Sequence, residues 1–190
     1  DPGNLIWPLT ILAAAEKKLK HPAEQEKALA RVIPLAEKAW GNQHPDLLPL
    51  YAELADVRFA RGNYREAESY LKRVLTLQTA ELAPDDPLLA TTQYKLGVIA
   101  MAAGRHAEAE TYLTNALSTR FQALGEQHLD TAASLTAIGQ LYLAQQKYND
   151  AYDVLKRALD VREKRLGATH HDVGVTLAAL AWAELMLEFY

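Results

Sequence analysis

The 190-residue chain contains no cysteine. This absence excludes disulfide bonds, thiolate metal ligands and cysteine nucleophiles. It does not identify a compartment, because a chain of this length can bury enough apolar surface to fold without covalent cross-links. The chain does not begin with methionine, so we expect the natural N-terminus to lie upstream, and the localisation stays open.

Long apolar runs and a strong excess of one charge are also missing. The longest apolar stretch near the start, residues 5–12, is too short to cross a bilayer. Lys and Arg total 20 against 24 Asp and Glu, a formal net charge of −4. A slightly acidic surface is a poor match for a phosphate backbone. We therefore expect neither membrane insertion nor a nucleic-acid partner.

The sequence lacks the short motifs of common catalytic sites. It has no His-Glu-x-x-His, no glycine-rich phosphate loop and no Gly-x-Ser-x-Gly elbow. His44, His128 and His170 recur at one position of a repeated segment, with Asp86 at the same place in another copy. We interpret them as linker or helix-start residues and expect no enzyme activity, metal or cofactor. A catalytic pair of carboxylates is a possibility that the sequence leaves open.

What the chain does contain is a segment that recurs every 42 residues. Residues 61–67, 104–109 and 146–151 are versions of one turn and helix start, and a similar apolar ladder follows each of them. A fixed period of this length indicates a stacked array in which one supersecondary unit is copied. Such arrays favour binding along an extended surface over chemistry in a pocket.

Each copy is predicted to contain two antiparallel helices. Residues 47–58 place apolar side chains at three- and four-residue spacing, as in an amphipathic helix. Gly62 can end this helix with a positive φ, and Asn63 can start the next one with Glu66 as its capping-box partner. Alternating strand patterns and hairpin turns are almost absent, which rejects a propeller.

Small residues recur at matched positions, where they would let two helices approach closely. They are Ala55, Gly97, Gly139 and Ala181 in the first helices, and Ala67, Ala109 and Ala151 in the second. HEAT and armadillo repeats have similar periods, but this pattern resembles the tetratricopeptide repeat. The linkers at residues 82–87 and 124–128 are similar to the Leu-Gly-x-x-His-Pro-Asp linkers of kinesin light chains and their bacterial relatives.

This resemblance implies an all-α fold, a right-handed α-α superhelix of about four and a half helix-turn-helix repeats. We expect one array over residues 1–190, without a separate second domain. Its predicted parts are a degenerate first repeat at 5–41, regular repeats at 42–83, 84–125 and 126–167, and an unpaired first helix at 168–190.

In tetratricopeptide arrays the first helices line a concave groove. Transferred by register, this groove would be lined by Trp7, Thr10, Ala14, Pro49, Ala52, Glu53, Asp56, Phe59, Thr91, Tyr94, Lys95, Val98, Met101, Ala133, Thr136, Ala137, Gln140, Leu143, Ala178, Trp182 and Met186. The polar candidates for orienting a partner are Glu53, Asp56, Tyr94, Lys95 and Gln140. The apolar candidates for anchoring it are Phe59, Met101, Leu143 and Trp182.

Each of these residues also has a purely structural interpretation. Phe59, Met101 and Leu143 share one register, so they could pack between neighbouring first helices instead of contacting a partner. Glu53 and Asp56 could simply be solvated.

Two features of related tetratricopeptide proteins are absent here. Only Lys95 is basic in the central groove, so a ring of cations for a C-terminal carboxylate is missing. The paired asparagines of kinesin light chains are also missing from the first helices. The groove therefore suggests an apolar segment with some positive charge as its ligand.

The leading hypothesis is a non-enzymatic scaffold that binds a peptide or helix of a partner protein. One alternative is a self-assembly module that forms homo-oligomers through apolar ends, because residues 172–189 are apolar on nearly all sides. Another is an accessory domain of a larger enzyme or sensor.

Overall fold

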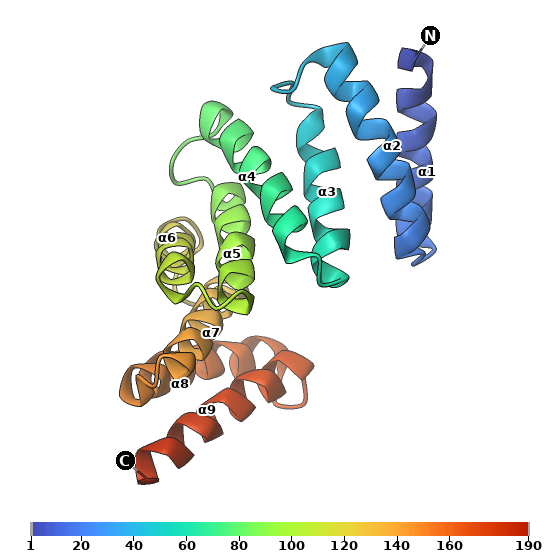
Figure 1. Ribbon diagram of the computed structural model, residues 1–190. Helices are drawn as coiled ribbons and strands as arrows, with labels where there is room; N and C mark the ends of the chain where they lie inside the picture. The colour runs from blue at the N-terminus through green and yellow to red at the C-terminus, as the bar shows by residue number, and fades with distance from the viewer. Residues whose placement is uncertain (1, 190) are drawn as a thin grey trace. The chain divides into compact units, whose positions relative to one another are not determined.

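The computed structural model describes residues 2–189, with side chains from Asn4 onward. Within these residues the chain forms a short 3-10 helix, nine α-helices and no strand, which confirms the predicted all-α class (Figure 1). The helices are η1 (Pro2–Leu5), α1 (Ile6–Lys18), α2 (Pro22–Trp40), α3 (Leu47–Ala60), α4 (Tyr64–Glu81), α5 (Pro87–Ala102), α6 (His106–Leu124), α7 (Leu129–Ala144), α8 (Tyr148–Leu166) and α9 (His171–Phe189).

The chain divides into two compact units, one ending at Leu82 and the other beginning at Ala83. Helices α1 to α4 form the first unit and α5 to α9 the second, and within each unit successive helices pack on one another. The division falls one residue before the predicted boundary between the second and third repeats, which lies between residues 83 and 84. A single array across both units stays a prediction.

Tight turns join the two helices of each repeat. Gly62 and Gly104 have φ values of +78° and +73°, a region that glycine enters without a steric penalty. The predicted role of Gly62 is thereby confirmed. In the fourth repeat Gln146 adopts the same kind of conformation, with φ of +61°.

The capping box predicted at the start of α4 is wrong. Asn63 occupies the N-cap position, but its side chain accepts no capping hydrogen bond. Glu66 lies in the first turn of α4, and its carboxylate instead meets the guanidinium of Arg58 on α3 at 2.7 Å. The Glu66 carboxylate that the capping box requires is thus bound to Arg58 of the neighbouring helix.

The recurring linker residues act at helix starts, as the sequence indicated. The Nδ1 atoms of His44, His128 and His170 each accept the backbone N–H of the residue two places later, at 3.2, 3.1 and 3.1 Å. At the matched position, Asp86 Oδ1 accepts the corresponding N–H at 2.8 Å. An imidazole nitrogen and a carboxylate oxygen therefore play the same role, because each accepts a backbone N–H that has no partner within the helix.

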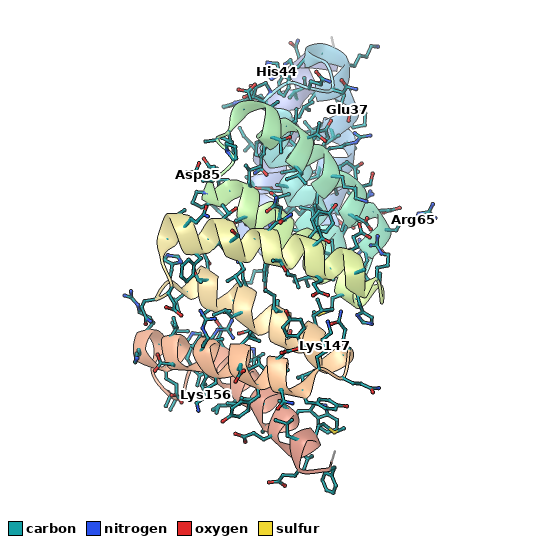
Figure 2. All side chains as sticks on the ribbon, turned by 90° about the vertical axis from the view of Figure 1, so that its left-hand side faces the viewer. Glu37, His44, Arg65, Asp85, Lys147 and Lys156 are labelled. Atoms are coloured by element: carbon teal, nitrogen blue, oxygen red, sulfur yellow. The ribbon has the colours of Figure 1, made fainter. Side chains whose placement is uncertain are left out.

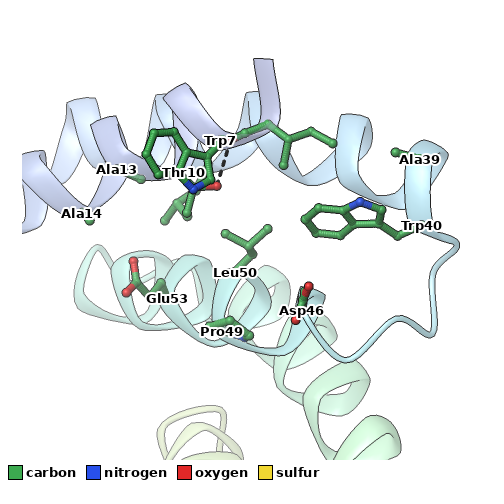
Figure 3. Close-up of a pocket in the computed structure, with 12 residues that line it drawn as sticks. Trp7, Thr10, Ala13, Ala14, Ala39, Trp40, Asp46, Pro49, Leu50 and Glu53 are labelled. Atoms are coloured by element: carbon green, nitrogen blue, oxygen red, sulfur yellow. Dashed lines mark hydrogen bonds between the residues drawn. The ribbon is translucent and has the colours of Figure 1, made fainter. Parts of the chain in front are cut away.

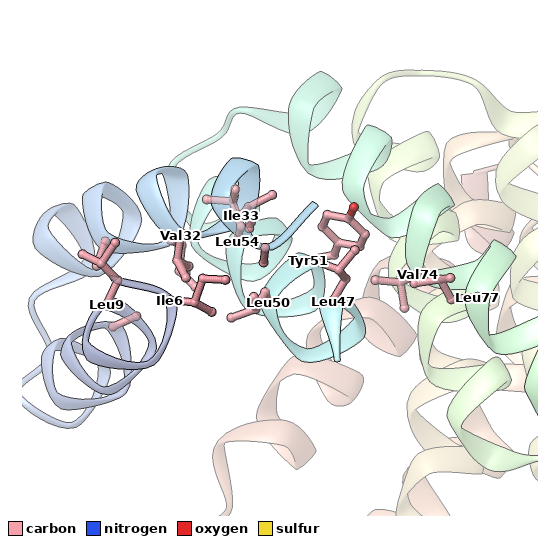
Figure 4. Close-up of a cluster of buried hydrophobic side chains, with 14 residues drawn as sticks. Ile6, Leu9, Val32, Ile33, Leu47, Leu50, Tyr51, Leu54, Val74 and Leu77 are labelled. Atoms are coloured by element: carbon pink, nitrogen blue, oxygen red, sulfur yellow. The ribbon is translucent and has the colours of Figure 1, made fainter. Parts of the chain in front are cut away.

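The first unit is built around one apolar core, shown in Figure 4. It draws buried side chains from all four helices of the unit, from Ile6 on α1 to Leu77 on α4. Charged residues lie on the outside, as Figure 2 shows for Arg65, which points away from α4. The second unit has smaller apolar clusters, which join α5, α6 and α7, then α7 and α8, then α8 and α9.

A polar network fastens α2, α3 and α4 beside the first core. The hydroxyl of the fully buried Tyr51 donates to Glu37 Oε1 at 2.7 Å, and Arg73 Nη1 lies 2.5 Å from the same oxygen. Burial, reinforced by the Glu37 carboxylate, raises the pKa of Tyr51 to about 12. The network therefore depends on a protonated phenol.

Buried arginines link successive repeats in the second unit. Arg120 on α6 donates through Nη1 to the backbone oxygen of Asp130 at 3.0 Å and to Ser134 Oγ at 2.9 Å, both on α7. Arg162, 42 residues later, makes the same two contacts with α9, the second to Thr176 Oγ1 at 2.6 Å. Burial lowers the pKa of both guanidinium groups, and these hydrogen bonds offset part of their desolvation.

The two helices of a repeat approach each other closely at glycines of the first helix. A Cβ atom on Gly139 would lie 2.5 Å from Leu155 Cγ, and one on Gly97 would lie 2.6 Å from Leu113 Cγ. These two positions confirm the predicted packing. The fourth position of the series, Ala181, is exposed, and no helix follows α9 within the described residues.

We expect Gly139→Ala to lower the free energy of unfolding by about 1–3 kcal/mol, because the added methyl displaces the fully buried Leu155. Gly174→Ala on α9 is the matched control, since a Cβ there has nothing within 4 Å. It should raise stability by up to about 1 kcal/mol through helix propensity. Urea unfolding measures both, and equal effects of the two substitutions would contradict this packing.

The Tyr51 network should make stability fall at alkaline pH. An unfolded tyrosine ionises near 10.0 and folded Tyr51 near 12, so its contribution is complete below pH 10 and is lost as the pH rises toward 12. The stability difference between the parent and Tyr51→Phe should therefore shrink over this range. Urea unfolding at several pH values measures it, and a constant difference would argue against the shifted phenol.

Candidate functional site

The three candidate residues of the first unit have different surroundings. Glu53 is half-buried and lines a pocket, whereas Asp56 is exposed on α3. Phe59 is half-buried and packs against Tyr64, with 5.4 Å between the ring centroids. Of the three, Glu53 therefore has a place in a cavity.

In the second unit, two apolar candidates are engaged in packing. Met101 packs on the cluster of α5, α6 and α7, and Leu143 on the cluster of α8 and α9. These contacts support the structural interpretation of both residues. The most exposed of the apolar candidates is Trp182 on α9, at 53%.

The polar candidates of the second unit are all half-buried. The ring of Tyr94 lies under the guanidinium of Arg120, with 4.7 Å from the guanidinium carbon to the ring centroid, and burial raises the pKa of the phenol. Lys95 follows on α5, and Gln140 lies on α7. Contact of these residues with a partner stays a prediction.

A cavity with a volume of about 500 Å³ lies in the first unit between α1, the end of α2 and α3 (Figure 3). Its lining residues are Ile6, Trp7, Thr10, Ala13, Ala14, Leu29, Ala39, Trp40, Asp46, Pro49, Leu50 and Glu53. We call this cavity the α1/α3 pocket. Its size is typical of sites that hold a small ligand or a few side chains of a peptide.

Two tryptophans and an apolar floor shape the α1/α3 pocket. Trp7 on α1 is 75% exposed, and Trp40 at the end of α2 is 38% exposed. Leu29 and Leu50 form part of the buried floor between them. Exposed indole rings above buried aliphatic groups are a favourable arrangement for a ligand, because each ring can bury a large area at small entropic cost.

The residues that line the α1/α3 pocket in the described chain include two acids and no base. Glu53 is partly compensated, because Lys17 Nζ lies 3.0 Å from one of its oxygens and Gln25 Nε2 lies 3.4 Å from the other. Asp46 lies at the opposite end of the pocket, on the side of Trp40, as Figure 3 shows.

The groove residues predicted from helix register include some of the residues that line this pocket but not the others. Helix register placed Trp7, Thr10, Ala14 and Pro49 with Glu53 on one line of the first helices, and the α1/α3 pocket contains all five. It missed Trp40 and Asp46 because it considered only the first helices. A signal was nevertheless available: Trp40 stands where the later repeats have Leu82, Leu124 and Leu166.

The described residues bear on two further kinds of site, a metal site and a membrane-spanning helix. In that part of the chain, no group of three or more His, Cys, Asp or Glu side chains is placed to hold a metal ion. None of the helices described is long and apolar enough to span a bilayer.

Solved structures with the same fold include kinesin light chain repeats. The chain is similar to the putative kinesin light chain TPR-like repeats of Podosopora anserina, with 24% identity, a TM-score of 0.77 and coverage of 98% of this chain and 88% of that one. It is also similar to BtubC (BKLC) from P. vanneervenii, with 18% identity, a TM-score of 0.71 and coverage of 99% and 85%. At these identities the likeness shows the fold alone.

Comparison with sequence families gives the relationship directly. No curated protein matches the chain. The sequence model of the tetratricopeptide repeat matches residues 46–117, 88–164 and 138–188 in overlapping stretches that cover most of the chain. Together with the helix pairs and the 42-residue period, this match shows that the chain is a member of the tetratricopeptide repeat family, with an all-α fold that kinesin light chain-like repeats share.

Proposed function

We propose that the chain is a non-enzymatic scaffold that binds a peptide or helix of a partner protein on its first helices. The α1/α3 pocket would be the main binding site. The tetratricopeptide fold is in general a scaffold for protein–protein interaction, which supports this class of function. The observation that carries the proposal is Trp7, an indole left 75% exposed at the mouth of a cavity of about 500 Å³.

Burial of Trp7 by a partner would supply a large part of the binding energy. Tryptophan is enriched among the few interface residues that dominate affinity, and such residues sit in pockets from which the partner excludes water. The buried core beneath the pocket keeps its floor in place, because Leu29 and Leu50 belong to the cluster that joins all four helices of the unit. A partner side chain would therefore meet a preformed site.

We expect peptides selected from a random library on the 190-residue chain to depend on Trp7. Trp7→Ala should weaken them by about tenfold or more, because an anchor of this kind is worth at least ~1.4 kcal/mol. Phe121→Ala, which removes an exposed aromatic ring from α6, a second helix, is the matched control and should change the affinity by less than about twofold. Isothermal titration measures both, and selected peptides that are indifferent to Trp7→Ala would contradict the proposal.

A second candidate function, self-assembly, draws on α9. This helix leaves several large apolar side chains exposed, namely Val175, Leu177, Trp182, Leu185 and Phe189. Exposed apolar side chains of this kind suit contact with another protein surface, which in a homo-oligomer would be a second copy of the chain.

Light scattering over a range of protein concentrations separates the two functions. Self-assembly through α9 predicts a mass that rises with concentration in the parent and stays at the monomer value in Leu185→Lys. The scaffold proposal predicts the monomer mass for both proteins at every concentration. A parent mass that stays at the monomer value at every concentration would therefore argue against self-assembly.

A further inference from the structure

We infer that the α1/α3 pocket selects a lysine or arginine side chain of the bound segment and holds its cationic head between the ring of Trp40 and the carboxylate of Asp46. The inference rests on the proposed function, because it specifies what the same pocket recognises. It commits the pocket to one occupant, a basic side chain flanked by apolar residues.

The apolar part of the pocket fits the stem of such a side chain. Lysine and arginine carry three or four methylene groups that prefer an apolar surface while the charged head stays near water. In the pocket, Leu50 and Ala13 provide that surface, and Trp7 covers it from α1 (Figure 3). A shorter cation would leave this floor uncovered.

The charged end of the pocket favours a cation through two separate contacts. The Trp40 ring offers a π face, which attracts an ammonium or guanidinium group within about 6 Å of its centroid. Asp46 adds a full negative charge beside that ring (Figure 3). Glu53 contributes less, because Lys17 already lies 3.0 Å from it.

Within the described part of the chain, the structure places His44 beside Asp46, with 3.8 Å between His44 Nδ1 and Asp46 Oδ2. This nitrogen accepts the backbone N–H of Asp46 at 3.2 Å, so in this arrangement it carries no proton and presents no N–H to the carboxylate. The imidazole also packs against Trp40, with 5.3 Å between the ring centroids. His44 therefore supports the indole and leaves the Asp46 charge for an incoming cation.

Other occupants match the pocket less well. A partner carboxylate would meet two acids and no base among the lining residues. A neutral aliphatic side chain would cover the floor but would leave the Asp46 charge without a partner. The charge of the side-chain head is therefore the property that the pocket distinguishes.

The test uses the 15N-labelled 190-residue chain and the blocked amino acid N-acetyl-lysine N-methylamide as the probe. The indole N–H signals of Trp7 and Trp40 report on the pocket, and that of Trp182 on α9 is an internal control. We expect the lysine probe to shift the first two signals and not the third. It should bind about fivefold more tightly than the neutral norleucine analogue, and the glutamate analogue should bind least.

Variants then assign the preference to its two proposed sources. Asp46→Asn and Trp40→Leu should each remove most of the difference between lysine and norleucine. Asp153→Asn, which deletes an exposed acid on α8, should leave that difference unchanged. Because leucine stands at the Trp40 position in the other repeats, Trp40→Leu is expected to fold, and the dispersion of the spectrum checks this.

Two of the outcomes separate this inference from the proposed function, and the third tests both together. Equal affinities of the lysine and norleucine probes, read at Trp7 and Trp40, would overturn the charge preference. The pocket would then remain a binding site without that preference. A preference that survives Asp46→Asn would overturn the role of that carboxylate. No shift of either indole with any probe would count against both proposals.

Discussion

The structure depends on one steric constraint, the close approach of two helices at a residue with little or no side chain. Leu155 packs where Gly139 leaves room, and Leu113 does the same at Gly97. In both of these repeats a leucine of the second helix thus fits against a glycine of the first. This contact recurs every 42 residues and fixes how the two helices of a repeat pair, because packed interiors have few free volumes to absorb an added methyl group.

Close pairing on one side of a first helix leaves another side for ligands. In the first unit, α1 and α3 both turn such a side toward the α1/α3 pocket, and the buried core beneath them holds the pocket floor. The Glu37, Tyr51 and Arg73 network holds the end of α2 against α3, and Trp40 lies one turn beyond Glu37. The pocket is therefore formed partly by helices that pack as in the other repeats. The other part is Trp40, which stands at a position where the later repeats have leucine.

Much of the fold could be predicted from the sequence because it follows from local chemistry repeated at a fixed interval. The helix pairs, the positive φ of Gly62 and the helix-start role of His128 all depend on a few neighbouring residues. The capping box failed because Arg58 binds the Glu66 carboxylate across a turn, which a local motif does not reveal. The contacts of Arg120 with α7 were likewise invisible to register, since they join residues of different repeats.

The candidate site was harder to predict for the same reason. Register correctly grouped residues of α1 and α3 that share a face, including Trp7 and Glu53. It could not include Trp40 or Asp46, because their place in the pocket depends on how the end of α2 and the following linker pack against α1. The nine candidate residues were chosen by helix position alone, so packed side chains such as Met101 entered the same set as exposed ones such as Trp182.

A double-mutant cycle between Gly139 and Leu155 tests the steric constraint most directly. The free energy of unfolding would be measured in urea for the parent, Gly139→Ala, Leu155→Ala and the combined variant. If the leucine side chain is what excludes a methyl group at Gly139, the alanine there should cease to destabilise once Leu155 is truncated, with a coupling energy of about 1 kcal/mol or more. Effects that add within about 0.5 kcal/mol would contradict the account.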